Sequence, residues 1–136
     1  MMRDLKAGGH LPNVDILTAW LSTRDYATLL AAADLGVCLH RSSSGVDLPM
    51  KIVDMFGAGL PVTAYSAYES FSELVKEGEN GCGFETPDDL SVILRRLLSS
   101  SSTELEKLRQ GAVREGSRRW DDEWDPVIGR TLGLVA

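Results

Sequence analysis

Short apolar segments alternate with segments of helical periodicity along most of this chain, and this alternation restricts its fold more than any other feature. The run LGVCLH at 35–40 is almost continuously apolar, which is typical of a strand covered on both faces. Before it, Tyr26, Leu29 and Ala33 recur at the spacing of one helix face. The alternation predicts an α/β fold, with an open parallel sheet and helices on both of its faces.

The expected elements cover nearly the whole chain. Strands are expected at 14–20, 35–40 and 60–65, with a short extended piece at 82–85. Helices are expected at 23–33, at 48–58, within 69–81, from Pro87 to the serine run 99–102, at 103–118 and past Pro126. Ser22 and Thr86 are the expected N-caps of two of these helices. Residues 1–9 resemble the end of a helix whose preceding strand is missing, so we expect residues 1–136 to form one truncated domain.

Charge and composition exclude several classes of function. A formal net charge of −6 disfavours a nucleic-acid partner, because binding to a phosphate backbone requires a basic face. No apolar run approaches the roughly 20 residues that cross a bilayer, and the first residues do not resemble a signal peptide. Cys38 and Cys82 lie in different segments without metal-ligand spacing. We therefore expect no metal site and place both thiols in a reducing compartment.

The stretch SSSGVDLPMKIVD at 42–54 is the strongest candidate for a binding site. It connects the expected strand 35–40 to a helix that begins near Leu48, and ligands of parallel sheets bind where strands end and helices begin. Backbone N–H groups at a helix N-terminus favour an anion, and the serine hydroxyls at 42–44 add hydrogen-bond donors. Gly45 lets a ligand approach the backbone closely. This stretch therefore predicts a phosphate site.

The charged residues that follow share one side of the expected helix. With Asp47 at zero, Lys51 falls at about 40° and Asp54 at about −20°. The opposite arc, which we expect to face the core, holds Ile52, Val53, Met55 and Phe56. A lysine and a carboxylate beside an anion site suit a nucleotide diphosphate. The same pattern also describes an ordinary surface helix in which Asp47 is the N-cap and pairs with Lys51, and the stretch has no Walker or dinucleotide glycine pattern.

The run WLSTRDYATLLAAADLGVCLHRSSSGVDLPMKIVDMFGAGLPV closely resembles the C-terminal half of chitobiosyldiphosphodolichol β-mannosyltransferases. The resemblance continues through ELVKEGENGCGFETPDDL to RRWDDEW, so it covers nearly the whole chain from residue 14. FGAGLPV also resembles a small-residue turn of the wider two-domain glycosyltransferase superfamily, in which an acidic residue occupies the position of Asp54. The resemblance implies the Rossmann-like C-terminal half of a GT-B glycosyltransferase, without its first strand.

This resemblance implies that the half binds GDP-mannose as the donor substrate and needs no cofactor. The residues that it assigns to the diphosphate or the mannose are Ser42, Ser43, Ser44 and Gly45. Lys51 would offset phosphate charge, Asp54 would hold the ribose, and Asp47 would either contact mannose hydroxyls or only cap the helix.

Three weaker candidates complete the expected site. His40 contacts the donor or only satisfies a neighbouring carbonyl, and Trp20 and Leu21 either border the guanine or belong to the core. We expect Glu73 to be an ordinary surface residue.

The implied activity is that of an inverting β-1,4-mannosyltransferase that transfers mannose to chitobiosyl-diphosphodolichol during assembly of the N-glycan precursor. Hydrogen-bond donors and a cation would stabilise the charge on the departing diphosphate. We assign no catalytic base, because acceptor-side groups of GT-B enzymes usually come from the N-terminal domain. Family members act at the cytosolic face of the endoplasmic reticulum membrane, and other mannosyltransferases are further expected partners.

The N-terminal domain and the membrane anchor of family members do not occur in this sequence. The missing domain would bring the lipid-linked chitobiose acceptor, so we expect this chain alone to be inactive. The alternative is a non-catalytic relative that binds a GDP-sugar or docks on other glycosylation enzymes. We also expect an exposed strand at 14–20 to promote association of the domain.

Overall fold

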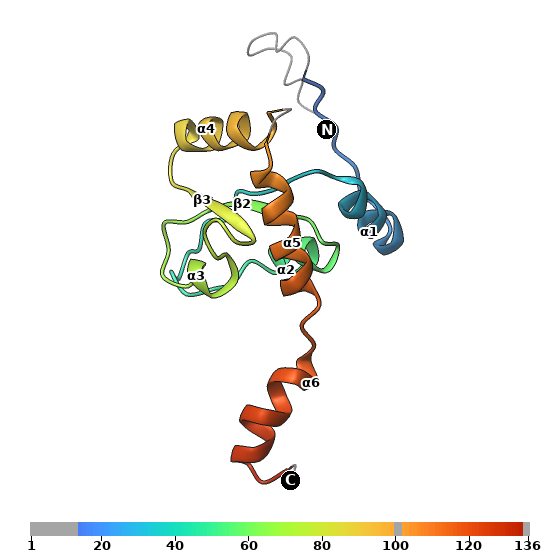
Figure 1. Ribbon diagram of the computed structural model, residues 1–136, viewed down its shortest axis with the longest axis vertical. Helices are drawn as coiled ribbons and strands as arrows, with labels where there is room; N and C mark the ends of the chain where they lie inside the picture. Colours follow the sequence, from blue (N-terminus) through green and yellow to red (C-terminus); the bar gives the residue numbers. More distant parts are fainter. Residues whose placement is uncertain (1–13, 100–101, 135–136) are drawn as a thin grey trace.

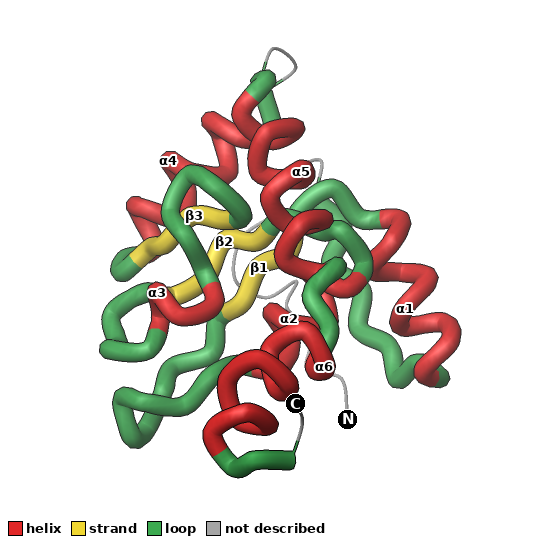
Figure 2. The backbone as a smooth tube through the Cα atoms, turned by 60° about the horizontal axis from the view of Figure 1, so that its bottom comes forward, coloured by secondary structure: helices red, strands yellow, loops and turns green. Residues whose placement is uncertain are grey.

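The computed structural model describes residues 14–99 and 102–134. A three-stranded parallel sheet lies at its centre, in the order β1-β2-β3 (Figure 2). The strands are β1 (Gly36–Cys38), β2 (Val62–Tyr65) and β3 (Gly81–Phe84). Val37 lies opposite Thr63, which in turn lies opposite Cys82. This parallel sheet with helices around it confirms the predicted α/β class (Figure 1).

The helices mostly follow the predicted segments (Figure 1). They are α1 (Thr23–Ala32), α2 (Met50–Gly57), α3 (Phe71–Leu74), α4 (Pro87–Leu97), α5 (Glu104–Gly116) and α6 (Trp120–Glu123), which continues into the π-helical turn η2 (Trp124–Gly129). Both expected N-caps are confirmed: the Asp25 N–H donates to Ser22 Oγ and the Asp89 N–H donates to Thr86 Oγ1, each at 3.2 Å. These bonds satisfy amides at the helix starts, which have no partner within the helix.

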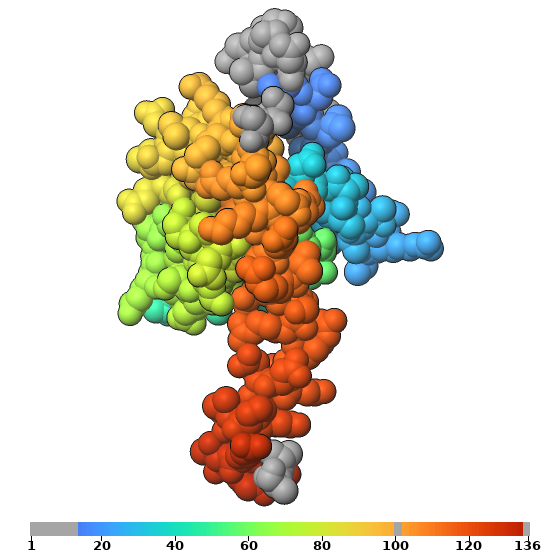
Figure 3. Space-filling view, in the orientation of Figure 1, coloured from blue at the N-terminus to red at the C-terminus, as the bar shows by residue number. Residues whose placement is uncertain are grey.

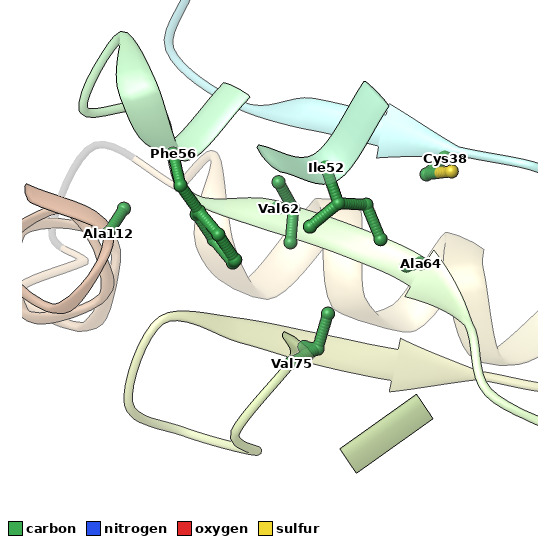
Figure 4. Packing of buried hydrophobic residues seen from close by; sticks show 7 residues of the cluster. All are labelled: Cys38, Ile52, Phe56, Val62, Ala64, Val75 and Ala112. Carbon is green, nitrogen blue, oxygen red and sulfur yellow. The ribbon is translucent and has the colours of Figure 1, made fainter. Parts of the chain in front are cut away.

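Two apolar clusters form the core, one on each face of the sheet. The first joins α2, α5 and the strands and consists of Cys38, Ile52, Phe56, Val62, Ala64, Val75 and Ala112 (Figure 4). The second lies under α4 and α5 and consists of Cys82, Phe84, Ile93, Leu97 and Leu108. Strand side chains alternate between the two faces, so Val62 and Cys82 belong to different clusters. Both cysteines are free thiols.

The prediction of a strand at 14–20 is wrong. Residues 14–22 have no regular structure and lead along the outside of the domain to α1 (Figure 1). Leu17 is 91% exposed and Trp20 is fully exposed, at 103%. A strand needs a neighbour to take its backbone hydrogen bonds, and the sheet of the described residues contains β1, β2 and β3 only. The expected helix end at 1–9 lies outside the described residues.

The helix expected within 69–81 is reduced to the single turn α3. Val75 follows it in an extended conformation, with φ −103° and ψ 114°, and its side chain is buried. The buried Asn80 holds this change of direction, because its Nδ2 donates to Leu74 O at 3.1 Å and its Oδ1 accepts from the Lys76 N–H at 2.8 Å. A side chain further along the chain therefore ends the helix, and apolar periodicity does not reveal such a contact.

The C-terminal segment is helical past Pro126, as predicted, but its helix begins earlier, at Trp120. Pro126 lies inside the π-helical turn η2, and a wider turn suits a residue that has no N–H to donate. This arm extends away from the body of the molecule (Figures 1 and 3). The rings of Trp120 and Trp124 stack on it, with centroids 5.3 Å apart. Among the described residues, no helix combines the length and the apolar character that crossing a membrane requires.

Candidate functional site

The serine turn, which we define as residues 42–47, connects the carboxyl end of β1 to α2. The loop after the neighbouring strand β2 holds its backbone at two points. The Glu69 N–H donates to Gly45 O and Ser70 Oγ donates to Asp47 O, each at 3.1 Å. Ser70 is 2% exposed, so its hydroxyl is a buried anchor. The loops that follow two parallel strands therefore meet at the carboxyl edge of the sheet, where ligands of such sheets bind.

Within the serine turn, polar side chains converge on the carboxylate of Asp47. Ser42 Oγ donates a hydrogen bond to Asp47 Oδ1, and Ser44 Oγ donates to the same oxygen at 3.4 Å. His40 Nε2 lies 2.5 Å from Asp47 Oδ2. The turn also satisfies some of its own amides, since the Gly45 N–H donates to Ser42 Oγ at 2.6 Å. Gly45 has φ +83°, a left-handed conformation that favours glycine.

The contacts of Asp47 keep it charged. The hydrogen bond from Ser42, and then the one from His40, hold the pKa of the Asp47 carboxyl below its usual value. Both bonds favour the ionised form of the acid. The serine turn therefore carries a negative charge of its own at neutral pH.

The alternative in which Asp47 caps the helix and pairs with Lys51 is wrong. Helix α2 begins at Met50, its N-cap is Pro49, and no side chain caps it. The carboxylate of Asp47 faces the serines and His40, which supply its hydrogen bonds, and no ion pair between described residues involves Lys51. Of the first amides of α2, that of Ile52 already donates to Pro49 O at 2.9 Å, and no side chain caps the helix start.

Lys51 and Asp54 are both exposed on α2, while Ile52 and Phe56 are buried as predicted. Val53 departs from the prediction, because it is 41% exposed. Met55, the remaining member of the predicted arc, is half-buried and packs against the first core cluster, so Val53 is the one member of that arc whose prediction is wrong.

Helix α1 contacts the same charged stripe. Tyr26 Oη donates to Asp54 Oδ2 at 3.4 Å. Partial burial and then the charge of Asp54 raise the pKa of Tyr26 above its usual value, so the phenol stays protonated and available as a donor. This link between α1 and α2 orients Asp54, and it was not visible in the sequence pattern.

The weaker candidates divide between the site and the surface. His40 contacts Asp47 directly and belongs to the serine turn's polar cluster. The core alternative for Trp20 and Leu21 is wrong, since Trp20 is fully exposed and Leu21 is 41% exposed on the segment before α1. Their role beside a guanine stays a prediction. Glu73 is exposed on α3, as expected of a surface residue.

Sequence reasoning did not identify Arg41 and Ser70. The guanidinium of Arg41 lies 5.2 Å from the ring centroid of Tyr65, the last residue of β2, which places a second cation next to the serine turn. Its position directly before the serines was a usable signal. Nothing in the sequence marks Ser70, whose bond to Asp47 spans 23 positions.

The arrangement is suited to binding an anion. It combines hydroxyl donors, the start of a helix and the cations Arg41 and Lys51 at one edge of the sheet. Within the part of the chain that the structure describes, no group of His, Cys, Asp and Glu side chains is arranged to hold a metal ion.

Comparison with known proteins agrees with this chemistry. Residues 2–100 match the protein family described as Glycosyl transferases group 1. The chain is 60% identical over 131 residues to a chitobiosyldiphosphodolichol beta-mannosyltransferase of Arthroderma benhamiae, covering 96% of this chain and 29% of that protein. A mouse protein of the same name is 44% identical over 129 residues, covering 93% of this chain and 27% of the relative.

A plant relative carries a different name. The UDP-glycosyltransferase TURAN of Arabidopsis thaliana is 45% identical over 135 residues, which cover 93% of this chain and 29% of that protein. The chain thus spans less than a third of the length of these curated relatives. No solved structure matches it. Because the family match covers residues 2–100, which include the serine turn and all of α2, this chain belongs to the group 1 glycosyltransferases.

Proposed function

We propose that this chain is the donor-binding half of a β-1,4-mannosyltransferase that transfers mannose from GDP-mannose to chitobiosyl-diphosphodolichol. The observation that carries the proposal is the 60% identity over 131 residues to a relative named for the transfer of mannose to this acceptor. The position of the serine turn and α2 at the carboxyl edge of the sheet supports it, since donors of such folds bind there.

The proposed reaction is an inverting displacement at the anomeric carbon of mannose. The acceptor hydroxyl oxygen forms the new bond to that carbon while the bond to the donor diphosphate breaks, GDP departs with the electron pair, and the acceptor proton passes to a base. This chain contributes stabilisation of the leaving diphosphate, through positioned donors and cations. We assign the base to the part of the protein that binds the acceptor.

The individual roles follow from the charges at the site. Lys51 has no ion-pair partner among the described residues, so its ammonium is available to the phosphates. The first two amides of α2 and the hydroxyls of Ser42, Ser43 and Ser44 supply the hydrogen bonds. Gly45, whose own N–H donates to Ser42 Oγ, lets the phosphates approach the backbone closely. Asp54, which Tyr26 contacts at 3.4 Å, accepts from the ribose hydroxyls.

The proposal also specifies which nucleotide the sugar donor carries. The name of the Arabidopsis relative specifies UDP, although that protein is 45% identical to this chain. We favour GDP because the relatives from Arthroderma and mouse are named as mannosyltransferases. Action at the cytosolic face of the endoplasmic reticulum membrane, on a dolichol-linked acceptor and alongside other mannosyltransferases, belongs to the same proposal.

Calorimetric titration of the purified 136-residue chain with GDP and, separately, with UDP tests the binding site. We expect GDP to bind more tightly, and Lys51→Ala to weaken GDP binding about tenfold, because a charge-assisted contact to phosphate is lost. Lys107→Ala is the matched control, since Lys107 is an exposed lysine on α5. Tighter binding of UDP would overturn the choice of nucleotide. Absence of heat with both nucleotides would favour the non-catalytic interaction module.

A turnover assay tests whether the donor-binding half catalyses mannose transfer by itself. We expect the isolated chain to release no GDP from GDP-mannose in the presence of a chitobiosyl-lipid acceptor, because the acceptor site belongs to another part of the protein. Transfer of mannose by these 136 residues would show that this half contains a complete active site.

A further inference from the structure

The donors of the serine turn are already engaged by a carboxylate of the same turn. Ser42 and Ser44 both direct their hydroxyls at Asp47 Oδ1, and His40 Nε2 lies 2.5 Å from Oδ2. Asp47 therefore occupies the position from which the serine hydroxyls can be reached, in the way that a bound anion would.

This geometry conflicts with simultaneous binding of a phosphate. A serine hydroxyl has a single proton to donate, so Ser42 cannot donate to Asp47 and to a phosphate oxygen together. The two negative groups would also repel each other at contact distance. The contacts from Ser42 and His40 keep the pKa of Asp47 low, so protonation of this carboxyl does not relieve the repulsion at neutral pH.

The Asp47 side chain can rotate away from the serine hydroxyls. The backbone of the turn is held independently of the carboxylate, by the bond from Ser70 Oγ to Asp47 O at 3.1 Å and by the bond from the Glu69 N–H to Gly45 O. The side chain of Asp47 is 42% exposed. It can therefore rotate into water while the turn keeps its shape.

We propose that the Asp47 carboxylate is an internal occupant of the serine turn, which must turn away from Ser42 and Ser44 before the phosphates of a nucleoside diphosphate bind there. The inference rests on the proposed function, and it makes Asp47 a residue that lowers the affinity for the nucleotide. In the free protein the carboxylate keeps the serine hydroxyls aligned, and on binding the phosphate takes over those same hydroxyls.

The test is a titration of Asp47→Asn with GDP, beside the unaltered chain, at a low ionic strength of about 50 mM so that charge effects are weakly screened. Removal of the charge should tighten GDP binding about fivefold, the effect of one unit charge close to another in a water-like environment. Asp121→Asn is the matched control, because it makes the same charge change on α6, and its affinity should equal that of the unaltered chain.

The outcomes distinguish a failure of this inference from a failure of the proposed function. Tighter binding by Asp47→Asn alone supports the internal occupant. Equal or weaker binding by Asp47→Asn, with clear binding by the unaltered chain, overturns this inference and leaves the proposed function standing. If neither protein binds GDP, the serine turn is not a phosphate site and both proposals fail. Asp47→Ser, which also removes the charge but retains an acceptor, replaces Asp47→Asn if thermal unfolding shows that the asparagine variant is not folded.

Discussion

The core around the sheet and the segment before α1 both contain large apolar residues, yet they have opposite environments. Ile52 and Leu108 are fully buried at 0% exposure, whereas Leu17 is 91% exposed. The sheet residues have helices on both faces of the strands, while 14–22 has no neighbouring strand among the described residues. Apolar composition therefore does not decide burial in this chain; burial requires a layer on the other side.

The largest expected effect tests the buried side of this comparison. Ile52→Ala should lower the free energy of unfolding by about 2–5 kcal/mol, because it removes a fully buried side chain of α2 and leaves a cavity. Val53→Ala is the matched control on the same helix, and its loss should be much smaller, since Val53 is 41% exposed. Urea denaturation followed by circular dichroism measures both. Equal losses would contradict the orientation of α2.

A smaller effect tests how closely the elements approach each other. Gly111→Ala should lower the free energy of unfolding by about 1–3 kcal/mol through overpacking, because its Cβ would lie 1.8 Å from Glu79 O. Gly57→Ala makes the same change in α2, where no atom lies within 4 Å of the new Cβ, and should be neutral or stabilising. Thermal unfolding of the two variants provides the measurement. A stable Gly111→Ala variant would show that α5 does not pack this closely.

The smallest expected effect tests the exposed segment 14–22. Trp20→Ala should change the free energy of unfolding by less than about 0.5 kcal/mol, because the fully exposed indole has no packing to lose. The same denaturation experiment measures it. A clear destabilisation would show that residues 14–22 pack against the body or against a second copy. Sedimentation of the unaltered chain separates these two cases, since self-association raises the apparent mass.

Much of the candidate site could be predicted because its pattern is local. Helical spacing correctly placed Lys51 and Asp54 on the exposed side of α2, and Ile52 and Phe56 on the buried side. Residues three and four apart share a face in any helix, so this result does not depend on the rest of the fold. The cap assignment of Asp47 is wrong for a physical reason. A carboxylate before a helix can accept hydrogen bonds from the first amides of the helix or from side chains of a nearby loop, and the carboxylate of Asp47 bonds Ser42 and His40 instead of the helix.

By itself, the sequence determined the alternation of strands and helices, the N-caps at Ser22 and Thr86, and the position of the serine turn between β1 and α2. These depend on periodicity and on hydrogen bonds that reach only a few residues along the chain. Only the tertiary structure decided that 14–20 is not a strand, that Asn80 ends α3, and that Ser70 anchors the turn. Asn80 bonds residues only four and six positions away, but apolar periodicity does not encode such side-chain contacts. The other two depend on what the fold places nearby: the described sheet has no strand beside 14–20, and the bond from Ser70 to Asp47 spans 23 positions. Local sequence preferences do not indicate the contact between Ser70 and Asp47, because it forms only once the strands lie side by side.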